Sequence, residues 1–328
     1  MKNALTLAVL VAAFLVACPA RAQVSFGDAS KFNDGWLFRL TDDSTIANPT
    51  FDDTQWRKLT LPHDWSIEGQ LSPSLASCTG YLPGGIGWYR KHFNITDNAA
   101  RHYIYFEGVY NRSEVYLNGH LLGKRPNGYI SFLYDITPYL KEGDNVLSVR
   151  VDHSRYADSR WYTGSGIYRD VWIIAAPEIH LAQWGTGWYA TSLTDRQATI
   201  AVDMEVQKHI ATREKLELSA TLYDAAGKQV AQRRTRVSDG KEGITKETLT
   251  LKVTKPHRWN LNDPYLYTLK AELLSNGKRI DGCETKVGLR TLDFDPNKGF
   301  ALNGNWMKVK GVCLHHDAGV LGLSIIHI

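Results

Sequence analysis

The chain has 328 residues, 43% of them hydrophobic and 22% charged, which is typical of a folded globular protein with about two domains and excludes wholesale disorder. Its formal net charge is only +4, and no run of basic residues is longer than two, so the basic face that nucleic-acid binding requires is absent. Aromatic residues reach 11% with 10 Trp and 16 Tyr, a content that suits either rings stacked on sugars or rings filling sandwich cores.

Residues 1–22 have the three-part pattern of a secretory signal, with Lys2 first, then the apolar run Ala4–Ala17, then small residues. Two processing sites compete: ordinary cleavage after Ala22, or a lipoprotein box in which Cys18 is lipidated. The apolar run is shorter than the roughly 20 residues that a spanning helix needs, and no second such run follows. We therefore expect an exported protein, periplasmic or extracellular, without a transmembrane span and with a lipid anchor at Cys18 as the alternative.

Three cysteines remain after the signal: Cys78, Cys283 and Cys313. An odd number without a Cys-x-x-Cys or Cys–His spacing argues against a disulfide framework and against a zinc site. We expect them to act as small buried hydrophobic residues.

The first block, residues 23–177, has the signals of strands and turns. Arg101–Phe106 is predicted to be a strand, and Asn118-Gly119 is predicted to close a tight hairpin between Glu114–Leu117 and His120–Leu122. Asn145–Asp152 alternates apolar and polar residues, as a half-buried strand does. Short strands at this spacing predict a β-sandwich or jelly roll, ending near Pro177.

The second block, residues 178–293, contains fewer aromatic residues and more regular alternation. Six strands in about 115 residues favour one immunoglobulin-like sandwich. The predicted strands are Ala198–Val206, Lys215–Tyr223, Gln229–Val237, Thr248–Val253, Tyr267–Leu274 and Arg279–Val287. A last block, residues 294–328, turns at Asn303-Gly304 and is predicted to form one more apolar strand, Met307–Leu314, which leads into His315-His316-Asp317.

Six segments along the chain together resemble the motifs of a known protein family. They are Leu61–Gly69, Gly87–Lys91, Phe106–Tyr110, Ser159–Val171, Trp259–Tyr267 and Lys310–Asp317. In order and spacing this set resembles the amino-terminal part of glycoside hydrolase family 2, and within it the secreted bacterial β-galactosidases.

The resemblance implies an all-β chain in which a jelly-roll sugar-binding domain (23–177) and an immunoglobulin-like sandwich (178–293) precede a (β/α)₈ catalytic barrel. Only the first strand of that barrel is expected within residues 294–328, because such barrels need about 250 residues. A truncated gene, a frameshift or a fragmentary assembly would each produce this ending.

Retaining glycoside hydrolysis needs an acid and a carboxylate nucleophile about 5–5.5 Å apart. In the family both are glutamates late in the barrel, and no residue of this chain matches either position, so we assign no catalytic residue. Glu107, Glu114 and Glu178 are expected to have turn or surface roles. No metal site or cofactor is assigned, although the resemblance allows a divalent or sodium ion in the longer family enzyme.

The resemblance places substrate-binding residues in two segments. His316 and Asp317, and less securely His315, would follow the first barrel strand, on the face where barrel active sites form. Asp158, Arg160 and Trp161 lie on a loop that reaches from the jelly roll toward the same pocket, where a carboxylate and a guanidinium suit sugar hydroxyls and an indole suits a pyranose face. The alternatives are a solvated turn for the first segment and packing between domains for Trp161.

We therefore expect part of a retaining β-galactosidase, acting on a β-galactoside oligosaccharide or polysaccharide. A β-glucuronidase or β-mannosidase origin is the alternative among enzymes. A stand-alone pair of carbohydrate-binding domains is the alternative outside them, and a degenerate product without function is the third. Trp65, Trp88 and Trp172 are expected to pack in cores rather than bind sugar.

Overall fold

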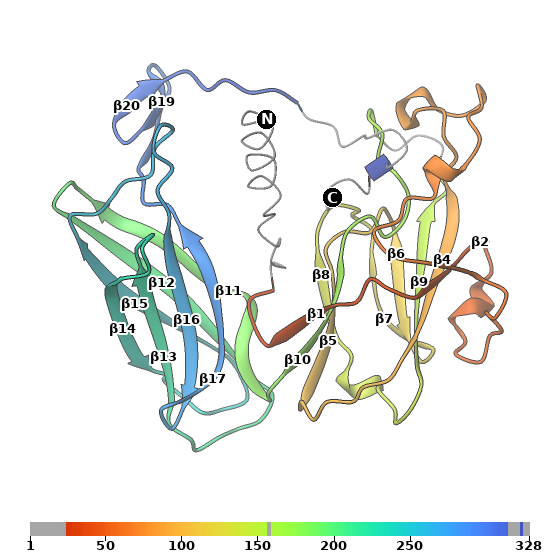
Figure 1. The fold of residues 1–328 in the computed structure, drawn as a ribbon, viewed down its shortest axis with the longest axis horizontal. Coiled ribbons are helices and arrows are strands. Elements are labelled where there is room, and N and C mark those ends of the chain that lie inside the picture. The colour runs from red at the N-terminus through yellow and green to blue at the C-terminus, as the bar shows by residue number, and fades with distance from the viewer. Residues whose placement is uncertain (1–23, 156–158, 314–321, 324–328) are drawn as a thin grey trace, which may run out of the picture.

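The computed structural model describes residues 24–155, 159–313 and 322–323. This part of the chain is all-β: it contains twenty strands and four short 3₁₀ helices, and no α-helix. Figure 1 shows two β-sandwiches side by side, joined between β10 and β11. The 3₁₀ helices are η1 (Ser44–Ala47), η2 (Ser66–Glu68), η3 (Ser77–Thr79) and η4 (Thr137–Tyr139).

The first sandwich consists of β1 to β10 in two antiparallel sheets. One sheet has the order β1-β10-β5-β8 and the other the order β3-β2-β4-β9-β6-β7. The strands are β1 (Asp28–Lys31), β2 (Trp36–Leu40), β3 (Arg57–Leu59), β4 (Gly85–Phe93), β5 (Arg101–Phe106), β6 (Ser113–Leu117), β7 (His120–Arg125), β8 (Phe132–Asp135), β9 (Asn145–His153) and β10 (Val171–Ala176).

Aromatic and aliphatic side chains fill the space between these two sheets. Ile104 and Phe106 of β5 face Val149 and Val151 of β9 across a core that also includes Trp65. Trp88 packs in a smaller cluster on the other face of the six-stranded sheet, beside Ile46 and Trp56. Trp65, Trp88 and Trp172 are all buried, as predicted.

The second sandwich consists of β11 to β17, in sheets of order β11-β12-β15 and β14-β13-β16-β17. The predicted strands of this block all form, and a long strand before them was not predicted. The strands are β11 (Ile179–Leu193), β12 (Gln197–Lys208), β13 (Leu216–Tyr223), β14 (Gln229–Arg236), β15 (Gly243–Thr254), β16 (Tyr267–Ser275) and β17 (Lys278–Val287). The regular alternation buries Leu249, Leu251 and Val253 of β15 and exposes the residues between them.

The two sandwiches share one apolar cluster. Phe26, Tyr103 and Trp172 of the first sandwich belong to the same buried cluster as Leu181 and Met204 of the second. Both faces of the four-stranded sheet of the first sandwich are thus covered, since Ile104 and Phe106 on its opposite face belong to the first sandwich's own core.

Polar groups in this joint are paired across the boundary. The Tyr103 hydroxyl lies 2.9 Å from His180 Nε2 and 2.8 Å from His209 Nε2. His180 Nδ1 lies 2.7 Å from the carbonyl oxygen of Leu181, so Nδ1 carries the proton and donates it there. The other ring nitrogen, Nε2, therefore accepts a hydrogen bond from the Tyr103 hydroxyl. The Tyr103 oxygen in turn accepts from His209 Nε2–H. The buried carboxylate of Asp281 accepts from the backbone N–H groups of Gly27 and Leu181 at 2.9 and 2.7 Å. Burial raises the pKa of the Asp281 carboxyl.

A small third sheet follows, formed by β18 (Leu292–Asp295), β19 (Gly299–Leu302) and β20 (Asn305–Met307). The predicted strand Met307–Leu314 is wrong for residues 308–313, which form no strand and expose Val309 and Val312. A parallel barrel strand is stable only between two neighbours and under covering helices. The described residues offer this segment no such neighbour. In Figure 1 it runs from the second sandwich toward the first.

The prediction that the cysteines are buried is wrong for Cys313 and holds only in part for the other two, of which Cys283 packs against the core. Cys78 and Cys283 are half-buried and Cys313 is exposed, and all three are free thiols.

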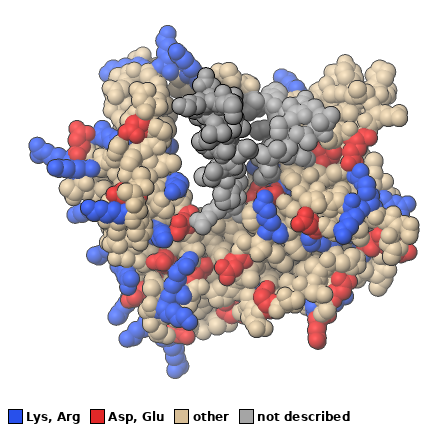
Figure 2. All heavy atoms as spheres, viewed as in Figure 1, with Lys and Arg blue, Asp and Glu red and all other residues tan. Residues whose placement is uncertain are grey.

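In the described residues no helix has the length and apolar character needed to cross a membrane. Figure 2 shows basic and acidic side chains interspersed over the visible face, with the basic ones denser on the second sandwich.

Candidate functional site

The predicted sugar-binding residues fall in three places. His315, His316, Asp317 and Asp158 lie outside the described residues. Arg160 and Trp161 lie on the loop between β9 and β10, and both are exposed. The predictions for all of these residues therefore stay predictions, and the structure adds the surroundings of the two that it describes.

Trp161 belongs to a small aromatic group at one end of the first sandwich. Its indole N–H donates to the Tyr129 hydroxyl at 3.0 Å, and the ring of Tyr129 meets that of Tyr110 edge to face at 5.3 Å. Trp161 and Tyr129 remain 41% and 46% exposed, enough for a ring face to meet a ligand. Such amphipathic rings bind sugars through their faces while their polar atoms stay paired.

Tyr162, which follows Trp161 in the chain, binds a buried carboxylate, Asp64, which is 2% exposed. Its Oδ1 accepts from the backbone N–H groups of Ser66 and Ser165 at 3.0 and 2.8 Å. Its Oδ2 accepts from the Tyr162 hydroxyl at 2.6 Å and from the backbone N–H of Leu323 at 3.0 Å. Four donors thus pair the carboxylate, and they come from three separate parts of the chain.

A histidine next to Asp64 ties β3 and β4 to the same loops. His63 Nδ1 lies 2.7 Å from the Tyr89 hydroxyl, and its Nε2 lies 3.1 Å from Glu68 Oε1 and 3.0 Å from Arg57 Nη2. Burial lowers the pKa of His63, which favours its neutral form. The ring thus joins Tyr89 on one side to Glu68 and Arg57 on the other and is a fixed linker.

Ser66, Ser165 and His153 form a hydrogen-bonded chain near Asp64. Serine and histidine are the residue types of a nucleophile and its base, but the hydrogen bonds here run in the wrong direction for that role. Ser66 donates to the Pro83 carbonyl at 2.8 Å, so Ser165 donates to Ser66 at 2.6 Å and His153 Nδ1–H donates to Ser165 at 2.6 Å. The histidine therefore donates to the serine instead of accepting its proton, and both side chains are buried. This chain braces the loops and does not activate a nucleophile.

The three glutamates for which we expect turn or surface roles have separate partners. Glu107 accepts from the Trp172 indole at 2.9 Å. Glu114 accepts from Tyr116 at 2.5 Å and from Lys124 at 3.0 Å. Glu178 lies 4.0 Å from Arg101. Each belongs to a different segment, so these side chains act in structural pairs.

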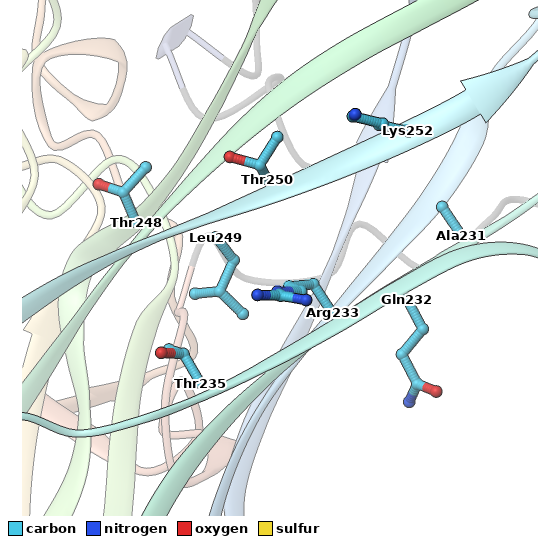
Figure 3. A pocket seen from close by; sticks show the side chains of 8 residues that line it. All are labelled: Ala231, Gln232, Arg233, Thr235, Thr248, Leu249, Thr250 and Lys252. Atoms are coloured by element: carbon cyan, nitrogen blue, oxygen red, sulfur yellow. The ribbon is translucent and has the colours of Figure 1, made fainter.

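The cavity in Figure 3 lies away from these residues, between β14 and β15. Its volume is about 540 Å³, with Arg233 and Leu249 pointing into it in Figure 3. Thr248, Thr250 and Lys252 also line it, and in that view they point away from β14. It is an opening between the edges of two sheets, and its polar groups do not converge on one point as those of a ligand site do. Within the described ranges, no group of three or more His, Cys, Asp or Glu residues could hold a metal ion.

Comparison with known families shows to which protein family this chain belongs. Residues 24–177 match the family model described as "Glycosyl hydrolases family 2, sugar binding domain", and residues 186–290 match the model "Glycosyl hydrolases family 2". The chain belongs to glycoside hydrolase family 2. The family thus assigns the first sandwich, with the Trp161 and Asp64 loops, to the sugar-binding domain.

Relatives and solved structures agree with this family. The chain is 44% identical over 318 residues to "Beta-galactosidase BoGH2A" of Bacteroides ovatus, covering 95% of the chain and 37% of that protein. It is 36% identical over 297 residues to a "Putative beta-glucuronidase" of Formosa agariphila, covering 89% of the chain and 28% of that protein. The crystal structure of a β-glycosidase from Bacteroides vulgatus matches with a TM-score of 0.82 at 38% identity, covering 91% of the chain and 38% of that structure. The chain thus spans less than two fifths of the length of these three proteins.

Sequence reasoning missed the central residue of this site. Asp64 was noted only as part of the Leu61–Gly69 segment, because nothing in the local pattern distinguishes a buried aspartate from a turn residue. Its donors at Tyr162, Ser165 and Leu323 lie far from it in the chain, so only the fold reveals its role.

Proposed function

We propose that this chain supplies the sugar-binding and second β-sandwich domains of an exported, retaining β-galactosidase of family 2. The observation that carries the proposal is the 44% identity, across 95% of the chain, to a protein named as a β-galactosidase. The exposed rings of Trp161 and Tyr129 support a sugar as the ligand at the end of the first sandwich.

In this proposal the two glutamates that cleave the glycosidic bond belong to the barrel domain of the longer family enzyme. One protonates the leaving oxygen and the other attacks the anomeric carbon, which gives a covalent intermediate that water then hydrolyses. The residues of this chain take no part in those steps. Arg160, Trp161 and the predicted residues Asp158, His316 and Asp317 would bind sugar hydroxyls and one pyranose face.

A β-glucuronidase is the second candidate, because the 36% identical relative carries that name. A chimera tests the two: residues 24–313 of this chain replace the matching segment of the Bacteroides ovatus protein, and the ratio of its activities on nitrophenyl β-galactoside and β-glucuronide is compared with the ratio for the unmodified protein. We expect the same ratio. A shift of the ratio toward the glucuronide would assign this segment to the other activity.

The chain alone is expected to bind galactose or lactose no tighter than about 1 mM, or about −4 kcal/mol, because only part of the pocket is present. Calorimetry measures this, with Trp161→Ala as the variant and Trp306→Ala, a similarly exposed indole on β20, as its control. A micromolar constant would instead favour a stand-alone carbohydrate-binding protein. The chain alone should also show no turnover of nitrophenyl β-galactoside.

A further inference from the structure

The strand β11 contains a β-bulge that presents an exposed tryptophan. The register with β12 shifts between Leu181 and Thr186, which places residues 182–185 outside the regular ladder. Trp184, within this bulge, is 56% exposed and has φ +59°, a left-handed conformation that bulky side chains rarely adopt. Because bulges change the direction in which a side chain points, the one in β11 holds a large ring at the surface in spite of the backbone strain.

Contacts from two other segments fix the bulge in this conformation. The Trp184 N–H donates to Ser25 Oγ at 3.0 Å, and the Ser25 N–H donates to Gln183 Oε1 at 3.0 Å. Gly185 is buried, and a Cβ there would lie 2.8 Å from Glu205 Cβ of β12. A strained backbone persists only where its surroundings enforce it, and such strain gathers at functional sites. The exposed ring is therefore a candidate for a function that its own sandwich core does not need.

Trp184 meets the first sandwich at Tyr105 of β5. Their ring centroids are 6.2 Å apart with an angle of 60° between the planes, and Tyr105 is 1% exposed. Two polar side chains belong to the same place. Ser131 is hydrogen-bonded to Tyr105, and Glu107 accepts from the indole of Trp172, which pairs directly with Tyr105 across the sheet. We call Trp184, Tyr105, Glu107 and Ser131 the bulge site.

The loop before β8 connects the bulge site to the Trp161 group. Tyr129 binds the Trp161 indole, and Ser131, two residues later, binds Tyr105. Two residues of extended chain span at most about 7 Å. Ile130, between them, is 64% exposed. An exposed path thus runs from Trp161 in the first sandwich to Trp184 in the second.

We propose that the bulge site is a second sugar-binding site, at which Trp184 binds one pyranose face of a polysaccharide that also contacts Trp161. An exposed indole suits the apolar face of a pyranose, and the Glu107 carboxylate and the Ser131 hydroxyl can accept from sugar hydroxyls. The inference rests on the function proposed above and extends it. The ligand becomes a long glycan, and the second sandwich takes part in binding it.

The test is electrophoresis of the full 328-residue chain through a gel that contains a soluble polysaccharide of β-linked galactose, whose binding retards the protein. Trp184→Ala should weaken binding about three- to tenfold, the range expected when one ring contact is lost. The matched control is Trp306→Ala, because this indole is 45% exposed on β20, away from the bulge. It should leave the retardation unchanged.

Trp184→Asn separates the ring from the backbone. Asparagine adopts the left-handed region readily, so this variant keeps the bulge and removes the indole. It should bind as weakly as Trp184→Ala. Binding equal to that of the unmodified chain in either Trp184 variant would overturn the inference. A change in self-association without a change in retardation would overturn it too, and would assign the ring to a contact between copies of the chain.

Trp161→Ala distinguishes this inference from the function on which it rests. Weaker binding in both Trp161→Ala and Trp184→Ala supports one ligand across both sites. Weaker binding in Trp161→Ala alone overturns the bulge site and leaves the proposed function intact. If the unmodified chain is not retarded, both sugar contacts are contradicted, while the activity ratio of the chimera tests the proposed function separately.

Discussion

In the first sandwich, charged and polar side chains lie inside, beside an aromatic core, whereas the strands of the second sandwich bury aliphatic side chains in regular alternation. Arg90, Asp64 and His153 of the first sandwich are 0%, 2% and 3% exposed; Arg90 and Asp64 each bind several segments, and His153 binds Ser165. In the second sandwich the strand β15 buries every second residue between Leu249 and Val253. The difference teaches that the first sandwich uses its buried polar groups to fix loop positions, while the second is held by packing.

The largest expected effect is at Arg90. Its guanidinium donates to Asp53 and the Ile46 carbonyl, both at 2.5 Å, and to Ser148 at 3.0 Å. Arg90→Met leaves the Asp53 carboxylate without its buried partner and should lower the free energy of unfolding by about 3–5 kcal/mol, measured by urea denaturation.

Lys208→Met is the matching variant in the second sandwich. Lys208 is also buried, but its partner Asp239 is about half exposed and stays hydrated when the ammonium is lost. We expect a much smaller loss there. Equal losses for Arg90→Met and Lys208→Met would contradict the contrast between the two interiors.

In the second sandwich we expect the free energy of unfolding to depend mainly on the packing of aliphatic side chains. Leu218 is fully buried in the cluster that includes Leu249 and Leu269, so Leu218→Ala should lower the free energy of unfolding by about 2–5 kcal/mol through lost burial and a cavity. The control is Leu261→Ala, because Leu261 is 62% exposed. A loss at Leu218 no larger than at Leu261 would show that packing does not hold this sandwich.

The joint between the sandwiches should respond to pH. Burial lowers the pKa of His180 to about 4, so the folded state binds its proton more weakly than the unfolded chain, in which the pKa is about 6.5. Unfolding therefore takes up a proton below pH 6.5, and stability should fall as the pH drops from 6.5 toward 4, by about 3 kcal/mol at most from this group.

Thermal melting at several pH values measures this effect. His180→Gln should flatten the profile in that window. Burial also lowers the pKa of His209 on the other side of Tyr103, so part of the slope should persist in the variant. An identical profile in the variant would place the titrating groups elsewhere.

The smallest effect is expected at the proposed sugar contact. Trp161 is 41% exposed, so Trp161→Ala should change the free energy of unfolding by no more than about 0.5 kcal/mol, as exposed positions usually do. Trp65→Ala is the contrasting variant, because Trp65 is 3% exposed and lies in the core. A large loss of stability at Trp161 would indicate a packing role for that ring.

Much of the strand order could be predicted, and the exceptions have physical causes. β5 and β9 follow clear local patterns, and both form where the sequence places them, apart from one more residue at the end of β9. β11 was missed because its register shifts between Leu181 and Thr186, which breaks the alternation. Residues 308–313 have an apolar pattern, but a strand also needs neighbours, which a pattern does not supply.

The candidate site could be predicted only in part. Its sugar-facing residues came from a family resemblance, whereas Asp64 required the fold, since its donors lie at Ser66, Tyr162, Ser165 and Leu323. Contacts over such separations leave no local trace in the chain. The same holds for Tyr103, whose partners His180 and His209 lie in the next domain.

The outer edge of the second sandwich has a consequence for solubility. β14 is the last strand of its sheet, so among the described residues one side of its backbone has no strand neighbour and offers hydrogen bonds to an extended chain. Arg233, Arg234 and Arg236 stand exposed along this strand. A second copy approaching edge to edge would bring like charges together at the distance of a β-ladder, which is unfavourable. The arginines thus oppose growth of this sheet into an intermolecular one, and the protein can keep a long open edge without aggregating through it.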